Sequence, residues 1–181
     1  MTESIKATRA SVLIGSIEVD GFMLPDGSYR MSQSQAAECI KDDAVYARNF
    51  LRSKTLKALR GKTYTPETFE VDPSSQVRGQ TRIQGWSLEI VFFYWVYRCF
   101  KGSKHAFPMV LALGSESLER RFDRAFGVTR TEQERDEQLT SRIQQLERDL
   151  AELGESFALD DLLRGERDYF ERLLRENGID P

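Results

Sequence analysis

The stretch Tyr29–Gly61, YRMSQSQAAECIKDDAVYARNFLRSKTLKALRG, decides the fold expected for this chain. Ser32 and Gln35 have the spacing of a capping box, in which each side chain satisfies a free backbone donor at a helix start. A short alanine-rich helix is expected to follow this cap. A longer helix is expected to begin near Asp42 or Asp43, because an acidic residue stabilises the positive end of the helix dipole.

The second helix of this stretch carries an uninterrupted run of positive charge. From Arg48 to Lys62 there are six Lys or Arg residues and no Asp or Glu, and Gly61 is the expected helix stop. Such a run also occurs on helix faces that are exposed to solvent and bind nothing. Glutamine, serine and asparagine lie beside it, however, and these side chains can bind base edges. The pattern therefore indicates a helix pair that lies on a polyanion, and double-stranded DNA is the expected partner.

The expected DNA contacts fall into two chemical roles. Cationic side chains neutralise phosphates, whereas amides and hydroxyls read base edges. The expected phosphate contacts are Arg48, Arg52, Lys54, Lys57 and Arg60. The expected base contacts are Asn49, Gln33 and Ser34. A strand expected over residues 78–86 would add a flanking contact through Arg78 and Arg82, although a charged edge strand would have the same pattern.

The sequence predicts that this stretch belongs to an α+β domain over residues 10–127. Apolar alternation over residues 12–19, with a bulge at Gly15, and a hairpin turn at Asp20-Gly21 indicate a small antiparallel sheet. A second turn is expected at Pro25-Asp26-Gly27. We expect this sheet to pack on a helical core, because three short strands cannot stand alone.

Two further helices are expected in this domain. Ser87 is a candidate N-cap for a helix that runs through Phe100 and is apolar nearly all round. Such a helix belongs in a core or in an obligate interface. Pro108 suits the first turn of the next helix, which is expected to end at Gly127 with a merely solvated outer face.

Residues 128–181 are expected to form a helical association module. Aromatic residues are absent between residues 129 and 155, and the apolar residues there follow gaps of 4, 3, 4 and 3. This heptad seam is formed by Leu139, Ile143, Leu146, Leu150 and Leu153. A stop at Gly154 and an acidic helical tail with a break at Gly165 are expected next. The seam predicts a coiled coil in a homodimer or higher homo-oligomer, although the same helix could fold back on its own body.

The charge distribution fits this division. The net charge is −3, but residues 1–112 carry 15 Lys and Arg against 11 Asp and Glu, whereas residues 113–181 carry 11 against 18. The chain therefore combines a mildly basic body with an acidic tail, as expected for a body that binds DNA and a tail with another task.

The residues expected in most catalytic sites are missing, so an enzyme is not expected. His105 is the only histidine, Cys39 and Cys99 lie far apart, and no glycine-rich phosphate loop is present. We expect no cofactor and no metal site. Acidic residues in the first hairpins and over residues 67–72 leave a metal-dependent DNA endonuclease as one alternative. A protein-assembly factor that uses the acidic tail and does not bind DNA is the other.

Cysteine usage and hydropathy predict a cytoplasmic protein. Two widely spaced cysteines form no disulfide framework, which is typical of a reducing compartment. No N-terminal signal pattern is visible. The most hydrophobic run, residues 90–97, is far shorter than the ~20 residues of a membrane-spanning helix, so no membrane association is expected.

The central stretch resembles the KilA-N and Bro-N group of DNA-binding domains, which occur in phage antirepressors and large DNA viruses. The resemblance covers about residues 10–100 and lies in DGSYRMSQSQAAECI (26–40), RNFLRSK (48–54) and the basic continuation TLKALRG (55–61). It implies a small α+β DNA-binding domain followed by a separate association module. The function that it implies is that of a transcriptional regulator or antirepressor acting as an oligomer.

Overall fold

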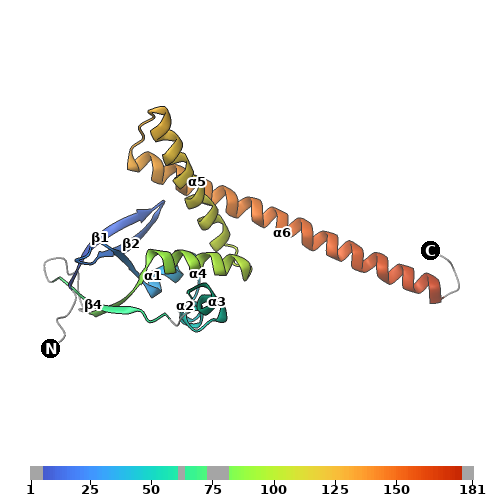
Figure 1. Cartoon of the computed structure of the whole chain (residues 1–181). Helices are drawn as coiled ribbons and strands as arrows, with labels where there is room; N and C mark the ends of the chain where they lie inside the picture. Colours follow the sequence, from blue (N-terminus) through green and yellow to red (C-terminus); the bar gives the residue numbers. More distant parts are fainter. Residues whose placement is uncertain (1–5, 61–63, 73–81, 177–181) are drawn as a thin grey trace. The chain divides into compact units, whose positions relative to one another are not determined.

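The computed structural model describes residues 6–60, 64–72 and 82–176, which form five strands and six helices. The strands are β1 (Lys6–Ile14), β2 (Ile17–Met23), β3 (Tyr29–Ser32), β4 (Glu67–Val71) and β5 (Arg82–Ser87). The helices are α1 (Gln33–Glu38), α2 (Ala44–Leu51), α3 (Lys54–Arg60), α4 (Leu88–Phe100), α5 (Ala106–Phe126) and α6 (Glu132–Glu176). The chain is therefore α+β, as expected (Figure 1).

The strands close into a barrel in the order β1-β2-β3-β5-β4. Four of the strand pairs are antiparallel, and the barrel closes through a short parallel pairing in which Lys6 lies opposite Glu70 and Ala7 opposite Val71. The sequence predicted a small antiparallel sheet and did not predict this closure. Because α1, α2 and α3 separate β3 from β4 along the chain, no local turn could have indicated it.

The first hairpin turns earlier than the sequence predicted. β1 and β2 are joined at Gly15-Ser16, where Gly15 has a left-handed φ of 61°. Asp20-Gly21 lies inside β2, so the hairpin turn expected there is wrong, and so is the bulge at Gly15. Gly21 faces close packing instead, because a Cβ there would lie 2.8 Å from Val12 Cγ2. Asp20 forms an ion pair of 2.6 Å with Arg9 of the neighbouring strand.

Gly85 of β5 is required by side-chain packing, which gives a first testable prediction. A Cβ at this position would overlap the ring of Phe69 and lie 2.9 Å from Arg30 Cβ. We expect Gly85→Ala to lower the free energy of unfolding by about 2 kcal/mol, because added carbon in a packed site forces neighbours to shift. Chemical denaturation measures this loss. Gly154→Ala is the control, since a Cβ there meets no atom within 4 Å and alanine favours a helix.

The helix starts agree with the local sequence signals. Ser32 Oγ accepts a hydrogen bond of 3.2 Å from Gln35 N at the start of α1. Asp43 Oδ1 accepts one of 2.8 Å from Val45 N at the start of α2. The Gln35 side chain also returns to the cap, where its Oε1 accepts a hydrogen bond of 3.2 Å from Ser32 Oγ, while its Nε2 donates one of 3.2 Å to Asp20 Oδ2.

The long basic helix expected after Asp43 is two helices. α2 ends at Leu51 and α3 begins at Lys54. Ser53 lies between them, and its Oγ accepts a hydrogen bond of 3.1 Å from Leu56 N. Ser53 thus caps the start of a new helix. Ser and Asn side chains often interrupt a helix in this way, because they form hydrogen bonds with nearby backbone groups.

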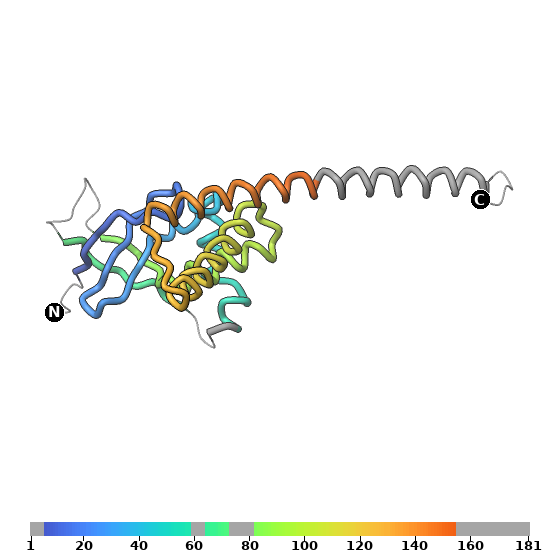
Figure 2. The backbone as a smooth tube through the Cα atoms, turned by 90° about the horizontal axis from the view of Figure 1, so that it is seen from above, coloured from blue at the N-terminus to red at the C-terminus, as the bar shows by residue number. Residues whose placement is uncertain are grey.

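The aromatic helix α4 lies in the main core, as its all-round apolar sequence predicted. Tyr94 contacts Phe50 of α2 and Trp86 of β5, with ring centroids 5.4 and 5.7 Å apart. Trp95 donates a hydrogen bond of 2.7 Å to the carbonyl of Ala36 in α1. This core joins one side of the barrel to α1–α5, whereas a smaller cluster around Phe22 and Phe69 fills the barrel itself. Figure 2 shows α2–α4 gathered on one side of the strands.

Ion pairs connect α5 to the first turns of α6. α5 contains Pro108 in its first turn and ends at Gly127 with a φ of 69°, both as expected. Its charged face is not merely solvated, which corrects the sequence-based expectation. Arg120 pairs with Glu132, Glu119 pairs with Arg142, and Asp123 accepts from Arg130 and Arg135 at 3.3 and 3.1 Å. These pairs hold α5 against residues 130–142.

α6 is one helix of 45 residues that runs through Gly154 and Gly165. The expected stop and the expected break are therefore both wrong. A glycine in a helix interior costs only about 1 kcal/mol, which good helix formers on both sides can offset.

The chain divides into two compact units, residues 1–143 and 144–181, so the division falls inside α6. In the first unit, Leu139 is 3% exposed and Ile143 packs against the main core. These two residues therefore contact their own chain, which corrects their assignment to an intersubunit seam. Leu146, Leu150 and Leu153 belong to the second unit, and their role in association stays a prediction.

Candidate nucleic-acid interface

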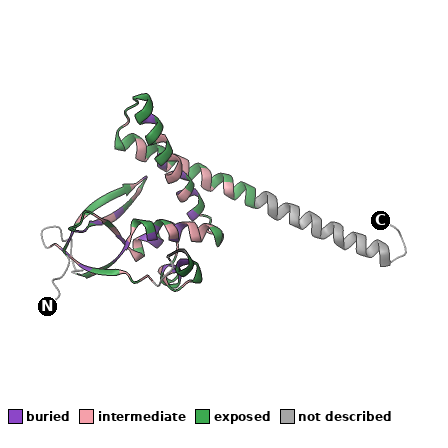
Figure 3. Cartoon of the chain, in the orientation of Figure 1, coloured by how far each residue is buried: buried purple, intermediate pink, exposed green. Residues whose placement is uncertain are grey.

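α2 presents a polar, cationic face on the side opposite its buried face. Ala47 and Phe50 are buried in the main core. Arg48, Asn49 and Arg52 are exposed, and their spacing of i, i+1 and i+4 places them on one side of the helix. The exposed surface of this helix is visible in Figure 3. Three of the residues predicted from the sequence thus share one accessible face.

A partly buried polar cluster fixes the start of α2 on α4. Asp42 Oδ2 accepts a hydrogen bond of 2.9 Å from the Tyr94 hydroxyl and one of 2.5 Å from Arg98 Nε. The Arg98 guanidinium also lies 4.1 Å from the centroid of the Tyr46 ring. Burial, together with the hydrogen bond to Asp42, raises the pKa of Tyr94, so its hydroxyl remains a donor at neutral pH. This cluster holds the cationic face in a defined orientation.

α3 continues the cationic surface. Lys54 and Lys57 are exposed on this helix, whereas Leu56 between them is buried in the main core. Arg60 is the last residue of α3, but its side chain lies outside the described part of the chain. The buried leucine fixes which side of α3 faces outward, and both lysines lie away from it.

Within the part of the chain that the structure describes, no ion pair compensates the charge of this surface. Among the residues that the structure describes, no carboxylate forms an ion pair with Arg48, Arg52, Lys54 or Lys57. Most of the other arginines whose side chains are described in the barrel and in α4–α6 are paired, as shown by Arg30 with Glu67 at 2.8 Å. Uncompensated cations on adjoining helices create a local positive potential that attracts anions. We name Arg48, Asn49, Arg52, Lys54 and Lys57 the cationic face.

The two remaining base-reading candidates lie in the first turn of α1. Ser34 is exposed, Gln33 is partly exposed, and the Ser32 and Ser34 hydroxyls lie 3.2 Å apart. α1 packs against α2, the helix that carries Asn49. The structure thus places all three candidates on neighbouring helices with accessible side chains.

The arginines of the expected strand over residues 78–86 do not join the cationic face. β5 begins at Arg82, and Arg78 lies outside the described residues. The Arg82 side chain is exposed, but its Nε lies 3.3 Å from Glu70 Oε1 on the neighbouring strand. Arg82 is therefore part of a cross-strand ion pair on the barrel, and its charge is offset there.

Lys101 is a further cation near α2, and the sequence did not identify it as a candidate DNA contact. Its Nζ lies 5.6 Å from the centroid of the Tyr97 ring, and that ring lies 5.2 Å from Phe50 of α2. Lys101 is exposed. Because α4 packs on α2 through these rings, Lys101 comes near α2, although it lies 49 residues after Arg52 in the sequence. Only the tertiary packing could have indicated it.

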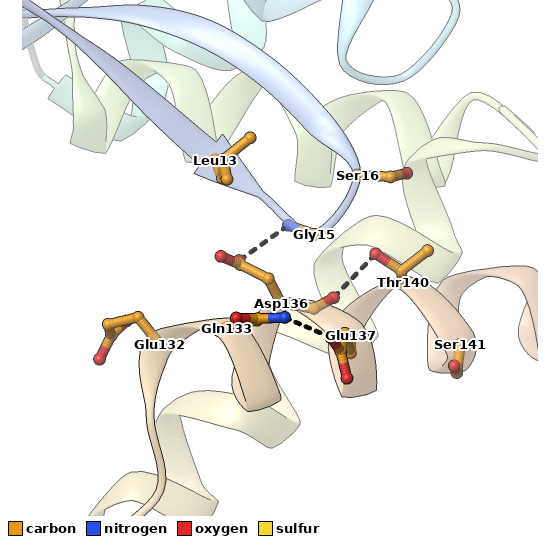
Figure 4. Close-up of a pocket in the computed structure, with 9 residues that line it drawn as sticks. All are labelled: Leu13, Gly15, Ser16, Glu132, Gln133, Asp136, Glu137, Thr140 and Ser141. Carbon is orange, nitrogen blue, oxygen red and sulfur yellow. Dashed lines mark hydrogen bonds between the residues drawn. The ribbon is translucent and has the colours of Figure 1, made fainter.

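A groove at the tip of the first hairpin is acidic and unsuited to a polyanion. It has a volume of about 720 Å³ (Figure 4). Its lining residues are Leu13, Gly15, Ser16, Glu132, Gln133, Asp136, Glu137, Thr140 and Ser141. Gly15 N donates to Asp136 Oδ1 at 3.3 Å, and Gln133 Nε2 donates to Glu137 Oε1 at 3.0 Å. The first of these bonds joins the hairpin to α6, whereas the second lies within α6.

Three of the acidic residues considered for a nuclease form ion pairs with arginines, while Glu18 and Asp26 accept hydrogen bonds from Ser11 and Ser28. Asp20 pairs with Arg9, Glu67 with Arg30, and Glu70 with Arg82. Within the described ranges, no group of three or more potential metal ligands lies together. Burial raises the pKa of Cys39 to about 11, so this thiol is protonated at neutral pH and is not an activated nucleophile.

Comparisons with known proteins gave no match, so the proposal for function is based on the structure and the sequence of the chain. A scan against protein-family models found no match, and searches of curated proteins and of solved structures found no significant similarity. Among the helices in the described part of the chain, none combines the length and the apolar character needed to cross a bilayer.

Proposed function

We propose that this chain is a DNA-binding protein, a transcriptional regulator or antirepressor that acts as an oligomer. The observation that carries the proposal is the cationic face, whose four cations are exposed and unpaired within the described residues and whose helices are fixed to the core. The resemblance of residues 26–61 to KilA-N and Bro-N domains supports the same function. The free thiols of Cys39 and Cys99 suit the reducing cytoplasm in which such a regulator acts.

Binding would combine phosphate neutralisation with base reading. Arg48, Arg52, Lys54 and Lys57 contact phosphates, which sets the affinity and its salt dependence. Asn49 lies between two of these arginines on α2, and its amide can form a bidentate pair with adenine N6 and N7. An α-helix with its side chains is about 10–12 Å across and fits a major groove about 12 Å wide. α2 is therefore the proposed reading helix, and α3 follows the backbone.

A mobility-shift assay tests the proposal against both alternatives. The full chain, mixed with duplexes of varied sequence at low salt, is expected to shift them equally with and without Mg²⁺ and to leave them intact. Binding should weaken steeply as salt rises, because counterion release drives phosphate contacts. Cleavage that requires Mg²⁺ would identify a nuclease. The absence of any shift at low salt would contradict DNA binding and favour an assembly factor.

A further inference from the structure

α5 is apolar on two opposite faces, only one of which contacts its own chain. Ala106, Met109 and Ala112 are buried against the main core. On the other side, large apolar side chains follow the helix from end to end. A helix that is apolar on both sides belongs between two partners. The second partner of α5 is not among the described residues of this chain.

The exposed side chains form a stripe along the helix. Phe107, Leu111, Leu118, Phe122 and Phe126 are 44%, 42%, 60%, 64% and 78% exposed. Their gaps of 4, 7, 4 and 4 residues keep them on one side of a helix with 3.6 residues per turn. The rings of Phe122 and Phe126 stack with centroids 6.5 Å apart. We name these five residues the α5 stripe. Exposed apolar side chains gathered on one helix face are of the kind that marks an interaction site.

Gly114 occupies the gap in the middle of the α5 stripe. Its φ is not positive, and a Cβ there would meet no atom within 4 Å. The fold of the described chain therefore gives no reason for a glycine, which weakens a helix interior. Glycine on a helix surface allows a second backbone to approach closely. Ser115, the next residue, is also small.

We propose that the α5 stripe binds the α5 stripe of a second copy of this chain in an antiparallel pair. Four of the five residues of the stripe are symmetric about the 114–115 bond, and Phe126 lies beyond this symmetric part at the end of α5. A two-fold axis there places Leu111 opposite the partner's Leu118, and Phe107 opposite the partner's Phe122. Gly114 lies opposite the partner's Ser115, so the closest approach of the two helices falls at the smallest residues. Such self-complementarity is what a two-fold symmetric interface requires.

The area of the stripe agrees with a dimer contact. An aromatic side chain has an area of about 150–250 Å², and a leucine has somewhat less, so the exposed fractions of these three phenylalanines and two leucines amount to on the order of 500 Å² per chain. Two copies would then bury at most roughly 1,000 Å², which is the lower limit for a specific interface. This contact uses none of the residues of the heptad seam or of the cationic face. It holds whether or not the chain binds DNA.

Oligomeric state tests the proposal most directly in a chain whose heptad seam is disabled. The background variant is the full chain with Leu146→Gln and Leu150→Gln. Size-exclusion chromatography with light scattering is expected to give twice the chain mass of 20.9 kDa for this background. Adding Leu118→Glu and Phe122→Glu is expected to give the monomer mass. Both substitutions replace exposed side chains, and circular dichroism should show unchanged helix content.

Gly114→Leu separates dimer formation from folding in the same background. A Cβ at this position would meet no atom within 4 Å, and leucine favours a helix, so thermal stability of the monomer should not fall. The dimer dissociation constant should rise at least tenfold, because the close approach is blocked. A background variant that is already monomeric, or a dimer that tolerates both Gly114→Leu and the double Glu substitution, would overturn the proposal.

A cysteine placed near the proposed axis gives an independent measurement. In a chain with Cys99→Ser, Ser115→Cys is expected to form a disulfide-linked dimer under mild oxidation. Ser117→Cys, exposed on the same helix but away from the axis, is the matched control and should cross-link at least tenfold more slowly. Equal cross-linking at the two positions would contradict the antiparallel register.

Discussion

Replacing Asp42 with alanine is expected to lower the free energy of unfolding by about 3 kcal/mol. The Asp42 side chain is 9% exposed and its partner Arg98 is 14% exposed. Removing the carboxylate leaves the guanidinium in a site with little water, and it also removes the acceptor of the Tyr94 hydroxyl. A buried charge left without its partner is among the most costly single changes in a protein. Urea denaturation followed by tryptophan fluorescence measures the loss.

Two matched variants separate the causes of this effect. Glu70→Ala breaks the exposed pair with Arg82 and is expected to cost less than about 1 kcal/mol, because water already screens that pair. Tyr94→Phe keeps the ring contacts and removes only the hydroxyl, so it should cost about 1 kcal/mol. If Asp42→Ala were no more damaging than Glu70→Ala, the cluster would not be what fixes α2 on α4.

Elements with strong local signals could be predicted from the sequence. Ser32 and Asp43 begin helices because their side-chain oxygens accept from the backbone donors that a helix start leaves free. Gly127 ends α5 because it adopts the left-handed conformation that terminates many helices. The aromatic helix that begins at Leu88 lies in the core, because a helix that is apolar on all sides has no polar face to expose to water. In each case the information lies within a few residues.

Elements set by distant contacts could not be predicted in the same way. Asp20-Gly21 has the composition of a hairpin turn, yet its glycine accommodates Val12 and its aspartate pairs with Arg9 on the adjoining strand. Gly154 has the composition of a helix stop, yet α6 continues past it. Leu139 fits a heptad seam, but the same spacing also fits a helix lying on its own core. The periodicity of the sequence shows that one helix face is apolar, but it does not show which surface packs against that face.

The same distinction between local signals and distant contacts applies to the candidate site. The sequence identified the cations of α2 and α3, because an acid-free basic run is visible without a structure. It did not distinguish Arg52, which is exposed without a carboxylate partner among the described residues, from Arg82, which pairs with Glu70. Lys101 reaches the neighbourhood of α2 only through the packing of Tyr97 on Phe50. Charge compensation is a property of the fold, whereas charge content is a property of the sequence.

Replacing Arg52 and Lys57 together with alanine is expected to reduce the salt dependence of DNA binding. If each cation neutralises one phosphate, the slope of log K against log salt concentration should become shallower by about two units. Affinity should fall most at low salt, and the difference from wild type should shrink as salt rises. Fluorescence anisotropy with a labelled duplex over a series of salt concentrations measures both quantities. Stability should change little, since both side chains are exposed and neither forms an ion pair in the described chain.

The matched control removes the same charge from another helix. Arg121 and Arg124 are exposed on α5, far along the chain from the residues of the cationic face. Among the described residues, no carboxylate forms an ion pair with either arginine. Their double alanine variant has the same net charge as the Arg52→Ala, Lys57→Ala variant, so a purely long-range effect of charge would appear equally in both. A local contact would appear only in the α2–α3 variant. An unchanged slope in that variant, or equal changes in the two, would show that phosphates do not lie on α2 and α3 and that the cationic face is a solvated surface.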